Sequence, residues 1–372
     1  MEIFVEFVRN TGSLLLYYVI PMVVVLGIMI FFHELGHFLA AKYFNVKVLK
    51  FALGFGPRIT AKEVGETEYS IRYFPLGGFV KMLGEDETDD ESKEIAPEDE
   101  KRAFNRQHPL KRIAIVAAGP FFNLVLAFLL FMGLFMVSGD YILTPEIGEV
   151  KEGSPAERAG ILKGDIIVSV QDVKIEKWED IKNIVQDHAG KPLLITVSRA
   201  GKLYSYSLIP EESVEENEFG EEVNRALIGI VNSGEVINID LSPVEAFKES
   251  LYQTWRWIKL TCLVVVKLFQ GSVSLKTVGG PIMIGQMTGQ IVQESISSLV
   301  PFMAIISINL GILNLFPIPI LDGGVILFLL FEMLLRRPVS LDKRELAQKI
   351  GLSILLLLMI VVFYNDVLRL FR

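Results

Sequence analysis

Residues 14–41 read LLLYYVIPMVVVLGIMIFFHELGHFLAA, an almost unbroken apolar run with three ionisable side chains near its end. The run exceeds the roughly 20 apolar residues that a helix needs to cross a bilayer. On a helix His33 and His37 lie one turn apart on the same face, where two imidazoles can bind one metal ion with Glu34 beside them. Because ionisable groups at membrane depth are costly, the pattern predicts a metal site inside a membrane.

Three further apolar segments, residues 113–137, 299–316 and 350–367, are also long enough to span a bilayer. Hydrophobic residues make up 51% of the 372 positions, above the roughly 45–50% of soluble domains. We therefore expect a polytopic α-helical membrane protein with about four transmembrane helices.

Lysine and arginine gather in two of the connecting loops. They are Lys42, Lys47, Lys50, Arg58, Lys101, Arg102, Arg106, Lys111 and Arg112 before the second segment, and Arg336, Arg337, Lys343, Arg344 and Lys349 before the fourth. By the positive-inside rule both loops lie in the cytoplasm, which leaves the N-terminus and the middle of the sequence outside. Arg369 and Arg372 favour the opposite orientation but are fewer.

Composition limits the possible partners. The net charge is −8, with an acidic run at residues 85–100 that is typical of a solvated loop, and we expect no nucleic-acid partner. The single Cys262 permits no intramolecular disulfide. We expect no cleaved signal peptide, because the first apolar run contains the metal motif.

Three parts follow from these patterns: an N-terminal membrane part at residues 1–144, a soluble domain at 145–212, and a C-terminal part at 213–372. The soluble domain is expected to have strands at 146–150, 166–170, 193–198 and 204–208, a short helix capped by Ser154 and a helix at 178–188. This order resembles a PDZ domain of the bacterial, circularly permuted type. Such a domain binds an extended peptide or a free C-terminus beside an edge strand, here expected at 146–150. A packed domain without a ligand is the alternative.

Residues 244–269 form an amphipathic pattern that includes Trp255 and Trp257, so we place this helix on the membrane surface. A fifth span is the alternative, and it would reverse the side of the C-terminus. Residues 46–82 alternate polar and apolar side chains around a turn at 64–66, which predicts a β-hairpin.

Catalytic zinc typically has three protein ligands and a water, so the two histidines need a third partner. Asp322 is the best candidate, because Pro317 and Pro319 break the helix before it and irregular backbone at membrane depth occurs only where protein or a wet cavity surrounds it. An ordinary helix N-cap is the alternative for Asp322. Glu34 would then take a proton from water and pass it to the leaving amine, which is peptide hydrolysis.

Other polar residues of the apolar segments could bind the substrate backbone or the developing oxyanion, or could join helices by hydrogen bonds. They are Asn123, Ser307, Asn309 and Asn314. We favour substrate binding for Asn314, because it lies near the proline break, and leave both possibilities open for Asn123.

The motif His33 to His37, the pattern Asn314-x-x-Pro317-x-Pro319-x-x-Asp322-Gly323, the pattern Gly119-Pro120-x-x-Asn123 and the inserted PDZ domain together resemble the site-2 protease family of intramembrane zinc metalloproteases. The bacterial, RseP-like group is the most similar, although its best-known members have two PDZ domains where this sequence has one.

The resemblance implies Zn²⁺ bound by His33, His37 and Asp322, with Glu34 as the catalytic acid/base and Asn314 at the substrate. It also implies a membrane-associated hairpin near the active site; a plain cytoplasmic ribbon is the alternative. An edge strand of that hairpin could bind the locally unwound substrate helix.

The substrates implied are single-pass membrane proteins already shortened by another protease, such as anti-sigma factors or signal-peptide remnants. They would be cut in the bacterial inner membrane toward the cytoplasm, during regulated intramembrane proteolysis, with the PDZ domain outside. A metal transporter should show repeated spans, which the sequence lacks. A catalytically dead scaffold has no need for Glu34.

Overall fold

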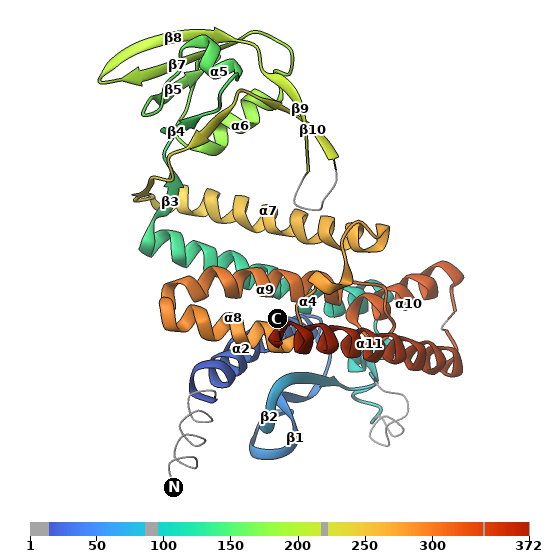
Figure 1. Cartoon of the computed structure of the whole chain (residues 1–372). Coiled ribbons are helices and arrows are strands. Elements are labelled where there is room, and N and C mark those ends of the chain that lie inside the picture. The colour runs from blue at the N-terminus through green and yellow to red at the C-terminus, as the bar shows by residue number, and fades with distance from the viewer. Residues whose placement is uncertain (1–14, 86–95, 217–221, 338, 372) are drawn as a thin grey trace. The chain divides into compact units, whose positions relative to one another are not determined.

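The computed structural model describes residues 15–85, 96–216, 222–337 and 339–371 (Figure 1). The protein divides into two compact units. Unit 1 comprises residues 1–134, 247–266 and 274–372, and unit 2 comprises 135–246 and 267–273. Most of the acidic run expected at 85–100 lies outside the described residues.

Among the described residues, three helices are long and apolar enough to cross a membrane. They are α2 (Ile20–Tyr43), which continues a π-helical turn at Leu15–Val19, α4 (Pro109–Ser138) and α11 (Leu341–Leu370). The spans expected at 113–137 and 350–367 lie inside α4 and α11, and the first lies in α2 and the turn before it, apart from residue 14, which is outside the described ranges.

The span expected at 299–316 differs, because helix α9 (Leu299–Asn314) has only 16 residues. Phe316 precedes Pro317, and the residue before a proline disfavours helical backbone, so the helix ends early. At 1.5 Å per residue α9 is about 24 Å long, shorter than the roughly 30 Å hydrocarbon core. Length and composition therefore support three spans, and a fourth remains a proposal.

Three further helices complete this part of the protein: α7 (Pro243–Gln270), α8 (Pro281–Glu294) and α10 (Asp322–Leu335). The helix expected at 244–269 is α7, which begins with a capping box between Ser242 and Glu245. It has the length of a span but not the apolar composition of one. Its place on the membrane surface stays a prediction.

The core of unit 1 that positions the site lies between α2, α4 and α9. Val25 and Met29 of α2 are buried against Leu126 of α4 and Met303 of α9. This packing brings the polar residues of the three helices close together.

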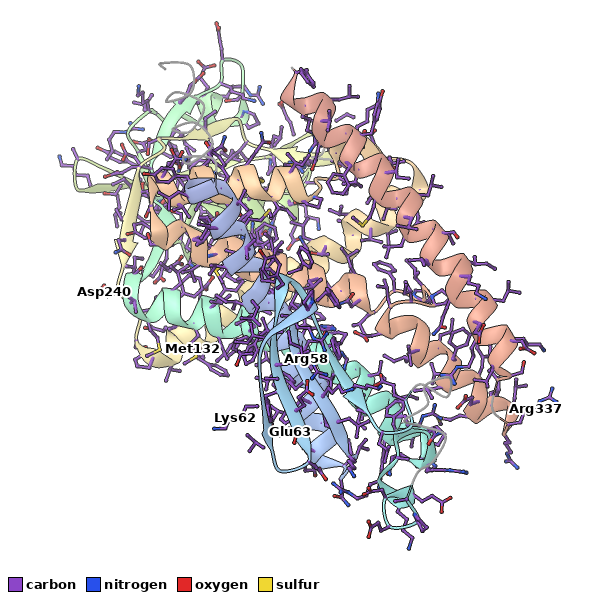
Figure 2. The ribbon with its side chains drawn as sticks, turned by 90° about the horizontal axis from the view of Figure 1, so that it is seen from below. Arg58, Lys62, Glu63, Met132, Asp240 and Arg337 are labelled. Atoms are coloured by element: carbon purple, nitrogen blue, oxygen red, sulfur yellow. The ribbon has the colours of Figure 1, made fainter. Side chains whose placement is uncertain are left out.

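The expected hairpin is present as β1 (Val48–Val64) and β2 (Thr67–Met82), but each strand bends and folds over. Residues 50–53 pair with 78–81 on one side and with 68–71 on the other, while 58–64 pair with 67–72. Gly54 and Gly56 make the bend in β1 with φ of 91° and 86°, which suit glycine. Figure 2 shows Arg58, Lys62 and Glu63 on the exposed outer segment.

The hairpin turn is fixed to the end of α2 by ion pairs. The Glu66 carboxylate lies 2.7 Å from Lys42 Nζ and 2.7 Å from both terminal nitrogens of Arg102. Hydrogen bonds from Arg102, supported by Lys42, hold the pKa of Glu66 at about 2, below its ordinary 4.5. The carboxylate is therefore charged throughout the physiological range.

Unit 2 contains the expected order of strands and helices. Its four-stranded sheet has the order β6 (Val173–Lys174), β5 (Ile166–Val170), β7 (Leu193–Arg199), β8 (Lys202–Leu208). The helices are α5 (Pro155–Ala159), whose Ser154 cap accepts from Glu157 N, and α6 (Trp178–Gln186). Ile147, Ile167, Leu193, Ile195 and Val197 have no exposed surface and form its core.

The unit is larger than the 145–212 expected. Strand β4 (Ile147–Val150) pairs with β11 (Ile230–Asn232), and β3 (Asp140–Leu143) pairs with β12 (Val236–Ile239). Strands β9 (Glu211–Glu216) and β10 (Glu222–Leu227) form a separate ribbon. The glutamate-rich sequence between residues 211 and 222 has the composition of a linker, so the sequence places a boundary there.

The edge strand expected to hold a peptide is paired in the structure. Residues 146–150 are not a free edge, because β4 has β11 on one side and backbone hydrogen bonds to Gly164 and Asp165 on the other. A groove of about 420 Å³ lies instead between α6 and residues 225–232. Its remaining lining residues are Lys151, Trp178, Ile181, Lys182, Val185 and Gln186.

Candidate metal centre

Helix α2 places His33 and His37 on one buried face, each with 8% of its surface exposed. Two glycines allow α4 to pack against this face. A Cβ on Gly36 would lie 2.3 Å from the Ala118 carbonyl oxygen, and one on Gly119 would lie 2.2 Å from His37 Nε2. Any larger residue at either position would displace α4 or the His37 ring.

The break after α9 positions Asp322. A Cβ on Gly323 would lie 2.2 Å from the Leu315 carbonyl oxygen, and one on Gly324 would lie 2.2 Å from that of Ile318. The loop can therefore fold tightly onto the start of α10 only with these glycines. Leu321 is the N-cap and Asp322 the first helical residue, so the helix-cap alternative does not describe Asp322.

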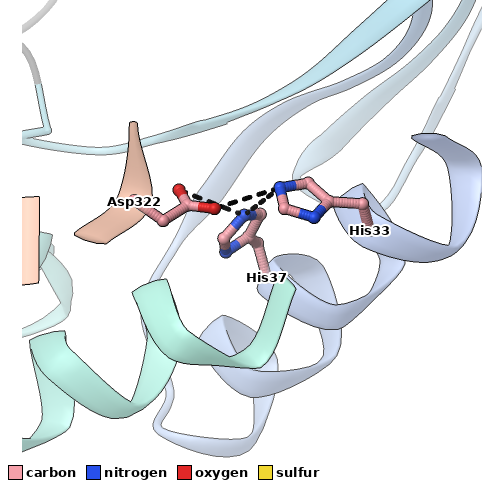
Figure 3. Close-up of side chains that lie close together, drawn as sticks. All are labelled: His33, His37 and Asp322. Atoms are coloured by element: carbon pink, nitrogen blue, oxygen red, sulfur yellow. Dashed lines mark hydrogen bonds and ion pairs between the residues drawn. The ribbon is translucent and has the colours of Figure 1, made fainter. Parts of the chain in front are cut away.

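The three side chains meet as Figure 3 shows. His33 Nε2 lies 3.2 Å from His37 Nε2 and 3.1 Å from Asp322 Oδ2, and His37 Nε2 lies 3.7 Å from Asp322 Oδ1. Ligand atoms about 2.0–2.2 Å from a tetrahedral zinc ion are about 3.3–3.6 Å apart. The nitrogen and oxygen donors thus have both the chemistry and the spacing of a zinc site that leaves a position for water.

The other ring nitrogen of each histidine faces α4. His37 Nδ1 is 3.0 Å from the Ile115 carbonyl oxygen, to which only a protonated nitrogen can donate. That bond leaves the His37 Nε2 lone pair available, the usual arrangement of metal-binding histidines. His33 Nδ1 lies 3.2 Å from Asn123 Nδ2. Asn123 has no exposed surface, so the structure does not favour the contact with substrate considered for it.

Glu34 lies between the two histidines in sequence, outside the three-residue cluster, and beside an edge of the hairpin sheet. A Cβ on Gly78 would lie 3.0 Å from Glu34 Cγ, and the Val80 backbone hydrogen-bonds to the Glu34 carboxylate. Among the described residues no further strand pairs with the edge formed by residues 78–80, and the Met82 N–H donates to Glu85 Oε2 at 3.0 Å. A polar backbone edge therefore lies next to a carboxylate.

The remaining polar residues separate into two groups. Ser307 Oγ donates to the Asn123 carbonyl oxygen at 2.8 Å, and Asn309 Oδ1 accepts from Thr261 Oγ1 at 2.7 Å, so both join helices. Asn314, the last residue of α9, is half-buried, and its side-chain amide has no hydrogen bond to any other part of the protein that the structure describes. Asn314 remains available to a ligand.

Sequence reasoning missed the packing role of Gly36 and Gly119, the Ile115 carbonyl and a buried ion pair. Gly119 precedes a proline inside an apolar helix, a signal that could have identified a close contact. The ion pair joins Arg112 Nη1 to Glu332 Oε2 at 2.9 Å, with both side chains 8% exposed. From the sequence, Arg112 counts only as a charge on a cytoplasmic loop.

Comparison with known proteins agrees with this geometry. The sequence model of Peptidase family M50 matches residues 21–358. A protein of Campylobacter jejuni is 38% identical over 348 residues, covering 93% of this sequence and 92% of its own length. One of Clostridium acetobutylicum is 38% identical over 341 residues (92% and 94%), and one of Agrobacterium fabrum is 33% identical over 359 residues (94% and 95%). The name of each of the three proposes a zinc metalloprotease.

Proposed function

Because this protein belongs to peptidase family M50, the site-2 protease family of membrane zinc metalloproteases, we propose that it hydrolyses peptide bonds inside the membrane-spanning segments of single-pass membrane proteins. One observation carries the proposal: two histidines of an apolar helix of 28 residues, Leu16–Tyr43, that is long enough to cross a bilayer form a cluster with Asp322. Charged groups at that depth are costly without a function.

His33, His37 and Asp322 are the proposed zinc ligands. When bound there, zinc supplies a Lewis acid that makes water reactive near neutral pH. Glu34 accepts the proton from the attacking water and delivers it to the leaving amine, since it is beside the ligands and is not one of them. Asn314 is the proposed contact to the substrate backbone.

The substrate segment must unwind before it can be cut, because a helix hides its amide groups in its own hydrogen bonds. The edge at residues 78–80 offers backbone groups to an extended strand beside Glu34. This supports a membrane-associated role for the hairpin, in which the edge holds the unwound segment at the acid–base group.

The proposed orientation follows the basic residues. The loop from α2 to α4 and the loop before α11 carry them, so both lie in the cytoplasm of a bacterial inner membrane, with α9 as a fourth span. Unit 2 then lies outside. Its element order and the groove beside α6 support a PDZ domain of an RseP-like protease, and Lys151 and Lys182 suit the carboxylate of a peptide C-terminus.

The function is tested with purified protein in vesicles and a single-pass substrate, supplied intact or with its outer domain shortened as another protease would leave it. We expect the shortened form, resembling an anti-sigma factor or signal-peptide remnant in regulated intramembrane proteolysis, to be cut within its apolar segment. Mass spectrometry of the products locates the cut. Cleavage only in extramembrane loops would contradict the proposal, and a Glu34→Gln preparation controls for contaminating proteases.

A second experiment tests whether unit 2 selects substrates without taking part in chemistry. Leu143 pairs with Val236, so replacing residues 144–235 by Asn-Gly closes the β3–β12 ribbon with a two-residue turn. We expect unchanged zinc content, continued cleavage of the shortened substrate and new cleavage of the intact one. Loss of zinc from the excised protein would show that unit 2 belongs to the catalytic core.

A further inference from the structure

Asn123 is buried beside the metal centre, and its side-chain oxygen has no hydrogen-bond partner among the described residues. The side chain belongs to α4 and has no exposed surface. Its amide nitrogen faces His33 Nδ1 at 3.2 Å, and its Oδ1 is buried without a hydrogen-bond partner among the described residues. An unsatisfied buried acceptor costs about 1–3 kcal/mol, so its retention next to the proposed ligands requires an explanation.

The two orientations of the amide correspond to two tautomers of His33. With Nδ2 toward the ring, Nδ1 must accept, and the ring proton sits on Nε2, the nitrogen nearest Asp322. Rotating the amide by 180° about the Cβ–Cγ bond exchanges the oxygen and nitrogen positions. Oδ1 then accepts from Nδ1–H, and the Nε2 lone pair is freed.

His37 shows that the second arrangement is built into this centre. Its Nδ1 faces the Ile115 carbonyl oxygen at 3.0 Å, an acceptor that cannot change role. Both histidines therefore have their Nδ1 atoms against α4, one facing a backbone oxygen and the other a side-chain amide. Histidines that bind metal commonly donate their second N–H to such an acceptor.

Asn123 itself is held in place by α9. Its backbone carbonyl oxygen accepts from Ser307 Oγ at 2.8 Å, and a Cβ on Gly311 would lie 3.3 Å from Asn123 Cβ. The backbone of Asn123 is thus fixed by contacts that do not involve the amide, which leaves the amide free to turn.

We propose that Asn123 is a positioning residue: its Oδ1 accepts the Nδ1–H of His33 and so selects the tautomer that presents Nε2 to zinc. The inference rests on the proposed ligand set. It places Asn123 against His33 Nδ1, the ring nitrogen that does not bind zinc, and away from the substrate. Loss of such a partner typically lowers metal affinity 10–100-fold.

The test is zinc affinity, measured by chelator competition in detergent. Asn123→Leu has nearly the same shape but no acceptor, and should weaken zinc binding 10–100-fold. Asn123→Asp keeps an acceptor at the same place and should stay within a few-fold of the unchanged protein, a rescue that packing alone does not explain. Thr261→Val, the matched control, removes the hydrogen bond between Thr261 of α7 and Asn309 of α9 without contact to Asn123 and should leave zinc affinity unchanged.

Equal affinity in Asn123→Leu and the unchanged protein, or equal losses with leucine and aspartate, would overturn the inference. Asp322→Asn, measured in parallel, distinguishes the two levels of failure. If it loses zinc while Asn123→Leu does not, only the inference fails; if neither loses zinc, the ligand set is wrong and the inference falls with it. Should Asn123→Leu not fold, ¹⁵N NMR of the zinc-loaded unchanged protein decides, because an unprotonated Nδ1 on His33 contradicts the assignment.

Discussion

The Glu34→Gln variant should retain as much zinc as the unchanged protein while cleaving its substrate about 10²–10⁴-fold more slowly. Glutamine keeps the shape of the side chain beside residues 78–82 but cannot accept a proton from water. The proposed ligands His33, His37 and Asp322 are untouched. Metal content by mass spectrometry of the purified protein and a cleavage rate in vesicles give the two readouts.

Asp322→Asn should lose activity for a different reason, the loss of zinc. The substitution removes the only anionic ligand of the proposed set, so zinc should be lost together with activity. The structure provides a matched control in Asp342, an exposed aspartate in the first turn of α11, where Asp342→Asn should change neither quantity. Full zinc and normal cleavage in Asp322→Asn would place the third ligand elsewhere.

Breaking the buried ion pair between α4 and α10 should be strongly destabilising. Arg112 and Glu332 are 2.9 Å apart, each side chain 8% exposed, and the Arg112 guanidinium also lies over the Phe104 ring at 5.2 Å. Removing one partner leaves the other charge buried, which typically costs about 3–5 kcal/mol. We expect this loss for Arg112→Met and for Glu332→Leu, measured as the free energy of unfolding in detergent.

The double replacement should recover most of that loss, because buried pairs replaced by apolar groups of similar volume are often close to neutral. The exposed pair Lys349–Glu345 within α11 is the control, since Glu345→Ala should cost only about 0.3–0.5 kcal/mol. Single variants within about 1 kcal/mol of the unchanged protein, or a double variant as unstable as the sum of both, would contradict this account. Because α10 begins with Asp322, we also expect weaker zinc retention in the single variants.

The part of the site that sequence could predict depends on local spacing. His33 and His37 face one way because a helix turns every 3.6 residues, and the break that turns Asp322 inward follows from two prolines and two glycines. The hairpin followed from alternation around its turn. The structure brings all of these together, while the roles assigned to the residues remain predictions.

Other features depend on contacts that no local pattern encodes. Arg112 and Glu332 are 220 positions apart, so nothing near either residue indicates the other. The groove beside α6 is completed by residues 225–232, which follow a glutamate-rich stretch with the composition of a linker. Asn123 could not be assigned, because whether an amide faces substrate or a ligand depends on how helices rotate against each other.

The short length of α9 bears on how water reaches a reaction within a lipid bilayer. A helix of 16 residues spans about 24 Å, and a span shorter than the hydrocarbon layer is accommodated by local thinning of the membrane at modest cost. Asp322 is at the far end of the loop that follows α9, and this loop folds back so that Gly323 packs on the Leu315 carbonyl oxygen at the end of α9. If α9 crosses the membrane as proposed, the lipid around it is drawn inward at that end, and the water consumed by each hydrolysis has a shorter distance to travel from the aqueous phase.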